Sequence, residues 1–177
     1  MFNLFKKKEP TIKVIDRIWM YEKFKLNAFA TELAKNPDTI FITWFDDSFQ
    51  KIQSALSIDP TPVYNSREVS PAHIAGKKVI LAEHYPLHEK ENNLFTKLGL
   101  AEVTVWSALD EPIFYRFGAE KIIQMMKQLG MKEDVPIEHN MISKAIRNAQ
   151  DKIAAKVTLE QDARSQNDWL ERNIPKS

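Results

Sequence analysis

Two histidines and a nearby carboxylate are the side chains of this sequence whose types could hold a metal ion. His84 and His88 have the i, i+4 spacing that can place two imidazoles on one metal, and Asp47 is available as a third ligand. Pro86 lies between the histidines and is expected to open a helix, so His84 precedes that helix and the shared face is lost. We therefore predict no metal site, and we interpret His84 as a hydrogen-bonded strand end and His88 as solvent-facing.

Other residue types that support catalysis lack the pattern that their chemistry needs. The acids at 46–47 and at 89 and 91 are sequence neighbours, which does not indicate two carboxylates held apart with different pKa values. A serine nucleophile would need a Gly-x-Ser-x-Gly turn, and a phosphate loop would need clustered glycines, but the four glycines occur singly. With no cysteine there is no thiol catalysis and no disulfide. We predict no catalytic residue and no cofactor.

Apolar runs typical of strands alternate with helical patterns over the first part of the chain. The predicted strands are 12–18, 39–44, 78–82 and 101–106. The predicted helices are 21–35, one capped by Asp46 or Asp47, and one that runs from Pro86 to a stop at Gly99. Strands separated by crossover helices predict an α/β fold, with a three-layer, mostly parallel sheet covered on both faces.

The carboxyl ends of such strands form the edge where open α/β sheets bind ligands. The predicted strands bring eight residues to this edge: Trp44, Phe45, Asp46, Asp47, Glu83, His84, Tyr85 and Ser107. The candidate ligand crevice that we select consists of Trp44, Asp47, His84 and His88.

The remainder of the sequence is predicted to be helical. A helix over 110–129 ends at Gly130, a loop follows through Pro136, and a long C-terminal helix occupies 137–172, before a tail at 173–177. The last helix carries one apolar stripe, Ile142, Ile146, Ala149, Ile153 and Val157. This stripe either packs on the protein's own sheet or forms a seam for a partner, which includes a second copy of the chain.

Charge and hydropathy limit the classes of partner. The chain has 25 basic and 24 acidic residues, a net charge of +1, and no basic stripe, so we predict no nucleic-acid binding. No apolar run approaches the length that spans a bilayer, and the start of the sequence does not have the order of a secretory signal. We expect a cytoplasmic protein whose residues 1–10 are flexible or, alternatively, form a weak membrane-surface anchor.

Five short sequence motifs occur in a fixed order from the end of the last predicted strand onward. They are WSALDE at 106–111, FYRFG at 114–118, MMKQLGMK at 125–132, IEH at 137–139 and KAIRNAQDK at 144–152. In order and spacing they resemble the second motor domain, and the start of the helical scaffold, of the preprotein translocase ATPase SecA. This resemblance implies that 11–130 form a RecA-like motor domain of the helicase C-terminal kind. After residue 152 the sequence departs from the family's pattern.

The resemblance also shows which part of a motor this sequence lacks. In the SecA family the strand that corresponds to 78–82 leads to arginines that reach ATP on the first motor domain, and such a finger raises the rate of phosphoryl transfer about 10³- to 10⁵-fold. Here 84–99 contain no arginine, and Lys90 and Lys97 are the only strong bases. A lysine does not make the planar, two-pronged contact of an arginine.

The resemblance therefore implies a degenerate motor domain that binds another protein, which would be a translocase component or a first motor domain on another chain. Two alternatives stay open. The first is a nucleotide-binding or ATPase subunit that acts in trans, and the second is an oligomerisation unit.

Overall fold

A computed structural model describes residues 12–174, so the predicted N-terminal segment 1–10 and residues 175–177 of the predicted tail lie outside it. Five strands form one sheet, with the order β1-β5-β4-β2-β3, and every pairing in it is parallel. The strands are β1 (Lys13–Trp19), β2 (Thr39–Thr43), β3 (Val63–Asn65), β4 (Lys78–Leu81) and β5 (Glu102–Ala108).

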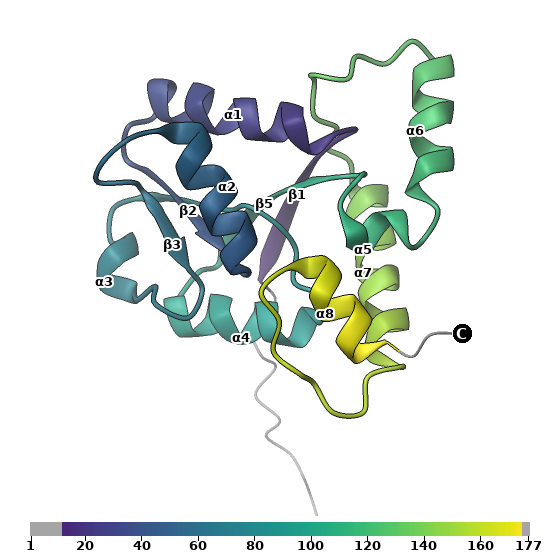
Figure 1. Ribbon diagram of the computed structural model, residues 1–177. Helices are drawn as coiled ribbons and strands as arrows, with labels where there is room; N and C mark the ends of the chain where they lie inside the picture. Colours follow the sequence, from purple (N-terminus) through teal and green to yellow (C-terminus); the bar gives the residue numbers. More distant parts are fainter. Residues whose placement is uncertain (1–11, 175–177) are drawn as a thin grey trace, which may run out of the picture.

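Helices cover both faces of this sheet (Figure 1). On one face lie α1 (Glu22–Lys35) and α2 (Asp46–Leu56), and on the other α3 (Pro71–Ile74) and α4 (His88–Leu98). Successive residues of a strand point to opposite faces, and Phe41 of β2 accordingly packs with Phe29 and Ile52, whereas Ile42 packs with Phe95. The predicted three-layer α/β fold, with a helical extension, is confirmed.

Four further helices follow the sheet: α5 (Pro112–Tyr115), α6 (Ala119–Gln128), α7 (Asn140–Ala154) and α8 (Gln166–Asn173). The predicted helix over 110–129 is divided between α5 and α6 because Gly118 adopts a left-handed φ of 81°. Between α6 and α7 the chain returns to the sheet, where Ile18 and Ile137 exchange two backbone hydrogen bonds of 3.0 and 2.9 Å.

The single long helix predicted over 137–172 is wrong, because the structure has α7 and α8 with a non-helical stretch between them. Ser165 ends that stretch: its hydroxyl accepts from the backbone N–H of Asp168 at 3.1 Å and caps α8. The side chain of Asn173 bonds in turn to both backbone groups of Gln161. Side-chain to backbone bonds of this kind compete with a continuous helix.

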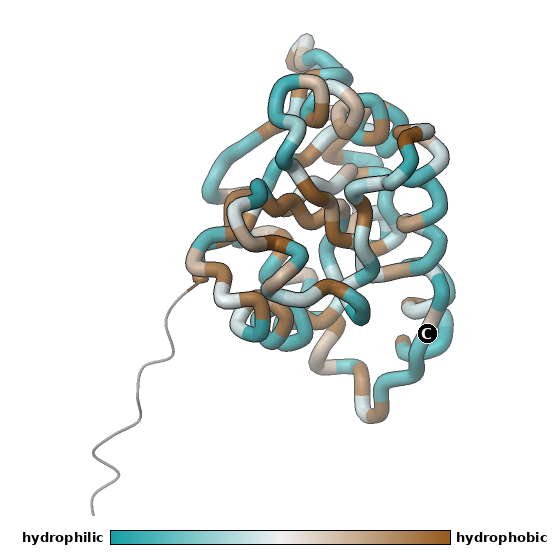
Figure 2. Tube along the Cα trace, turned by 90° about the vertical axis from the view of Figure 1, so that its left-hand side faces the viewer, coloured by the Kyte–Doolittle hydropathy of each residue, from teal (hydrophilic) through white to brown (hydrophobic). Residues whose placement is uncertain are grey.

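The last helices pack on the sheet domain. One buried cluster joins Phe45 after β2 with Ile113, Ile146 and Trp169, which come from α5, α7 and α8. Figure 2 shows apolar segments running through the interior of the chain trace. Within residues 12–174, no helix combines the length and the apolar character that a membrane crossing requires.

Candidate functional site at the carboxyl edge of the sheet

The connections leaving β2 and β4 diverge at the carboxyl edge of the sheet. These two strands are neighbours, but α2 and α4, which follow them, lie on opposite faces (Figure 1). A divergence of this kind opens the crevice in which α/β proteins bind ligands, and the helix N-terminus beside it favours an anion.

In this protein the side chain of Glu83 occupies the N-terminus of α2. Its Oε1 accepts from the backbone N–H groups of Trp44 and Phe45 at 2.9 and 3.2 Å, and its Oε2 accepts from the Ser48 hydroxyl at 2.6 Å. Burial raises the pKa of the Glu83 carboxyl above its usual value, although these donors oppose the shift. The chain therefore supplies its own acid where an anionic ligand would bind.

Asp46 and Asp47, predicted as caps of this helix, do not cap it. The residue at the N-cap is Phe45, which has no side-chain cap. Asp46 instead accepts from Arg67 at 3.1 Å, and Asp47 forms an ion pair of 3.3 Å with Lys51. Both aspartates lie in the first turn of α2, where a negative charge is favourable.

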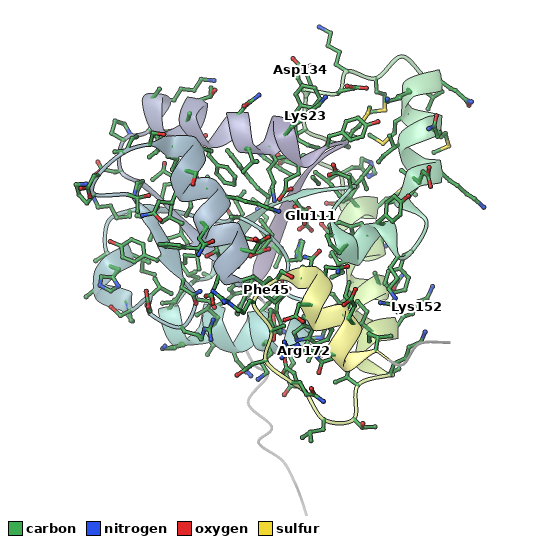
Figure 3. The ribbon with its side chains drawn as sticks, viewed as in Figure 1. Lys23, Phe45, Glu111, Asp134, Lys152 and Arg172 are labelled. Atoms are coloured by element: carbon green, nitrogen blue, oxygen red, sulfur yellow. The ribbon has the colours of Figure 1, made fainter. Side chains whose placement is uncertain are left out.

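A second buried acid ties α1 to the same edge. The ammonium of Lys25 pairs with Glu111 and also donates to the carbonyl of Ala82 at 2.8 Å. Glu111 accepts from the N–H of Ala108 at 2.9 Å, and it lies in the interior of the molecule (Figure 3). Burial raises the pKa of Glu111 to about 7, against the opposing effect of Lys25.

His84 lies between two carboxylates. Its Nε2 is 2.7 Å from Asp16 Oδ1, its Nδ1 is 2.9 Å from Glu91 Oε1, and all three side chains are buried. Burial by itself would lower the pKa of the imidazole, but the carboxylates of Glu91 and Asp16 outweigh it and raise the pKa of His84 to about 10. His84 is therefore a buried cation at neutral pH.

The four residues of the candidate crevice have different partners and surroundings in the structure. His84 has both ring nitrogens engaged by acids, while His88 has its Nδ1 3.2 Å from the amide of Asn92. Asp47 is exposed, and the ring of Trp44 packs on Tyr85 with a centroid separation of 4.9 Å. Among residues 12–174, no group of three or more His, Cys, Asp or Glu side chains is arranged to hold a metal ion.

Residues 155–174, here called the C-terminal cover, lie over this edge. The carbonyl of Arg164 accepts from the N–H of Asp47 at 3.1 Å, and the amide of Gln166 donates to the carbonyl of His84 at 3.3 Å. The fully buried ring of Trp169 packs edge-on against Tyr85, with 5.9 Å between ring centroids. The cover leaves a shallow polar depression of about 270 Å³ beside Asp46 and Arg164.

These contacts decide what chemistry the edge can perform. A general base needs a nitrogen or oxygen within reach of a substrate proton, and both nitrogens of His84 already contact acids of the protein. The three groups join β1, the end of β4 and α4, so their role is to hold these elements together. The sequence predicts His84 as a hydrogen-bonded strand end, but it contains no signal that its two partners are Asp16 and Glu91.

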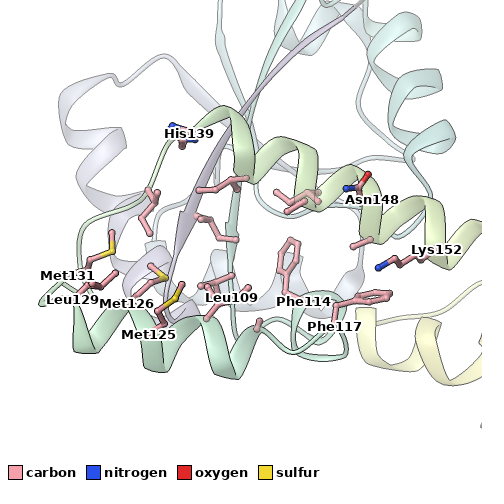
Figure 4. A pocket seen from close by; sticks show the side chains of 18 residues that line it. Leu109, Phe114, Phe117, Met125, Met126, Leu129, Met131, His139, Asn148 and Lys152 are labelled. Atoms are coloured by element: carbon pink, nitrogen blue, oxygen red, sulfur yellow. The ribbon is translucent and has the colours of Figure 1, made fainter.

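A second candidate site is an apolar groove between α6 and α7, with a volume of about 540 Å³ (Figure 4). Its floor includes Leu109 and Phe114, and one end is formed by Met125, Leu129 and Met131. No pattern in the sequence marks these residues as a site, because α6 follows the periodicity of an ordinary packed helix. These residues line a groove only because the fold places α7 opposite α6.

The predicted apolar stripe, whose first four residues lie on α7 and whose last, Val157, follows it, mainly packs inward. Ile146, Ala149 and Ile153 are buried, and Ile142 and Val157 are partly buried against the same cluster. Three residues of this stripe, Ile142, Ile146 and Ala149, also form one wall of the α6–α7 groove. What remains available to a partner is the groove-facing side of the stripe.

Comparison with known proteins finds similarity to SecA over part of the chain. The protein translocase subunit SecA of Syntrophobacter fumaroxidans is 33% identical over 86 residues, which is 46% of this chain. Those of Caldicellulosiruptor saccharolyticus and Clostridium beijerinckii are 32% and 34% identical, over 89 and 84 residues. No protein-family model matches the chain.

The similarity also covers only a small part of each relative. The matched part corresponds to 10% of the length of each of these SecA proteins. A segment of this chain is thus SecA-like, which confirms the resemblance that the motifs at 106–152 indicated.

Proposed function

We propose that this chain is a non-catalytic, SecA-related protein that binds another protein in preprotein translocation. The observation that carries the proposal is a SecA-like segment joined to a sheet whose ligand-binding edge is filled by the protein's own side chains. In this proposal 11–130 descend from a RecA-like motor domain, and the partner is a translocase component. The place of action that we propose is the cytoplasm.

The filled edge argues against a nucleotide there. A phosphate at the N-terminus of α2 would have to displace the carboxylate of Glu83 from the two N–H groups that it accepts. Access would also require the C-terminal cover to leave, which would expose Trp169 and break the bond from Gln166 to His84. Both steps are unfavourable for a ligand that is itself an anion.

The two strong bases of 84–99 stabilise the protein's own structure. Lys90 forms an ion pair of 3.1 Å with Glu160 of the C-terminal cover. Lys97 lies in the last turn of α4, where a cation stabilises the helix end, and it is exposed. Neither replaces the planar, bidentate contact with which an arginine stabilises a transferred phosphoryl group.

The test measures nucleotide and protein binding with the same purified full-length chain. Isothermal calorimetry with ATP and Mg²⁺ should give no binding heat, and phosphate release should equal the buffer blank. Immobilised chain should retain purified SecA or translocase-containing membranes from the same organism, in a manner independent of ATP.

Two results would contradict the proposal. The first is ATP hydrolysis that is abolished by Lys90→Ala or Lys97→Ala, since catalysis would then depend on these bases. The second is a failure to retain any translocase component above an equally immobilised control protein. The first result would favour the ATPase acting in trans, and the second would remove the link to translocation.

A further inference from the structure

We propose that the α6–α7 groove binds an apolar helix of a partner protein, with carboxylates of that helix beside Lys152. The groove has walls from α6 and α7 and a volume of about 540 Å³ (Figure 4). This inference rests on the proposed function and names the surface through which the partner is bound.

Exposed apolar side chains are concentrated around this groove. Ten large apolar residues are exposed among residues 12–174, and eight of them lie between 115 and 141. Five of these line the groove itself: Phe117, Ile122, Met125, Leu129 and Met131. Leu129 is 71% exposed and Met125 is 54% exposed. A contiguous apolar surface of this kind on a soluble domain marks an interaction site.

The dimensions and flexibility of the groove fit a helix. The α6 wall presents Ala119, Ile122, Met126 and Leu129, which are spaced by three or four residues. At a rise of about 1.5 Å per residue, this wall extends for about 15 Å, or roughly three turns. Apolar side chains of a partner helix repeat at the same interval, and methionines such as Met125 adapt to their shape.

The charge of the groove selects the chemistry of that helix. Among the residues of 12–174 that line it, the only polar ones are His139, Asn148 and Lys152, and no carboxylate is among them. Helix α7, which forms one wall, carries three cations, Lys144, Arg147 and Lys152, and the single acid Asp151. Figure 4 shows Lys152 at the end of the groove beside Phe117, opposite the methionine-rich end. A helix with acids beside that end is therefore complementary, and one with lysines there is repelled.

The experiment uses the purified full chain and fluorescein-labelled helical peptides of about three turns. One peptide has leucines at i, i+4 and i+7, with glutamates on its flanks. The second has lysine at every glutamate position, and the third has the first composition in scrambled order. Fluorescence anisotropy at low and high salt measures the dissociation constants.

The acidic peptide should bind at least about tenfold more tightly than the lysine peptide at low salt, and added salt should reduce the difference. Leu129→Glu should weaken its binding at least about tenfold. Leu159→Glu is the matched control, because Leu159 is 79% exposed and lies outside the groove, and it should leave binding unchanged. Lys152→Glu should reverse the preference between the two charged peptides. Thermal unfolding checks that each variant is folded.

Three outcomes would overturn the inference. In the first, neither charged peptide binds, or Leu129→Glu has no effect. In the second, only a small apolar dye binds, which would make the groove a ligand pocket. In the third, the chain self-associates in sedimentation and Leu129→Glu makes it monomeric, which would assign the groove to a second copy.

Repeating the retention assay with Leu129→Glu separates this inference from the proposed function. If a translocase component is retained equally by the wild type and by Leu129→Glu, the function stands and the groove assignment fails. If the acidic peptide binds at the groove but no translocase component is retained, the groove assignment stands and the link to translocation fails.

Discussion

Replacing His84 with glutamine should lower the free energy of unfolding by several kcal/mol at neutral pH. In the native protein the imidazole is a buried cation held at 2.7 and 2.9 Å from Asp16 and Glu91. Glutamine keeps a hydrogen-bond donor but removes the charge, which leaves two buried carboxylates without a counterion. Removing one partner of a buried ion pair costs about 3 to 5 kcal/mol. Domains commonly unfold with about 5 to 15 kcal/mol, so the variant should be marginally stable.

The free energy of unfolding of the wild type should fall as the pH rises, because His84 then loses its proton. Because the two carboxylates raise the pKa of His84 from 6.5 to about 10, the folded protein holds an additional proton between these values. The stabilisation is complete below about pH 6.5 and is lost as the pH rises through about 10. Between about pH 7 and about pH 9 the loss should amount to about 2 to 3 kcal/mol. His84→Gln should not show this dependence, because glutamine does not titrate.

Urea unfolding followed by tryptophan fluorescence measures both quantities in steps across this pH range. Trp169, a fully buried residue of the C-terminal cover, provides a signal at the carboxyl edge of the sheet. His88→Gln is the control, since it is the same chemical change at a histidine whose Nδ1 lies beside the neutral amide of Asn92. The reasoning is refuted if His84→Gln lowers the free energy of unfolding at neutral pH by less than about 1 kcal/mol, or if it retains the slope of the wild type.

Three further predictions concern the same edge of the sheet. Lys25→Met and Glu111→Leu should each lower the free energy of unfolding by about 3 to 5 kcal/mol, and the double variant should lower it by clearly less than the sum of the two. Urea unfolding of the four proteins in a double-mutant cycle measures this, and additive costs would contradict the pairing of Lys25 with Glu111. Glu83→Ala should cost about 1 to 3 kcal/mol by leaving buried N–H groups without an acceptor, whereas Glu83→Gln should cost less, measured in the same way. Trp169→Ala should cost about 3 to 5 kcal/mol and increase proteolysis of the C-terminal cover, and an unchanged cleavage rate would show that the ring does not hold the cover in place.

The order of most of the elements could be predicted because strand and helix signals are local. The run at 39–44 is β-branched and aromatic between turn residues, and the structure has β2 at Thr39–Thr43. Gly99 was expected to stop a helix, and α4 ends there with a left-handed φ of 70°. The similarity to SecA was likewise readable from short motifs in a fixed order, because such motifs do not depend on their partners in space.

The non-local features could not be predicted in this way. One continuous helix is predicted over 137–172 because helical periodicity takes no account of side-chain to backbone bonds that interrupt a helix, such as those of Ser165 and Asn173. Asp46 and Asp47 have the right type for a cap, but Glu83, 39 residues from Trp44 in sequence, reaches the helix end instead. The separation of two residues along the sequence does not show whether they lie close together in space.

The sequence by itself determined the α/β class, the order of most of the strands and helices, and the local resemblance to SecA, all of which depend on residues close together in the chain. The tertiary structure decided what the carboxyl edge and α7 became. It placed Asp16 and Glu91 on either side of His84, filled the ligand edge with Glu83, and set α6 opposite α7 to leave an apolar groove. These results arise from contacts between residues far apart in the chain, whose energies depend on burial and geometry that a linear pattern does not contain.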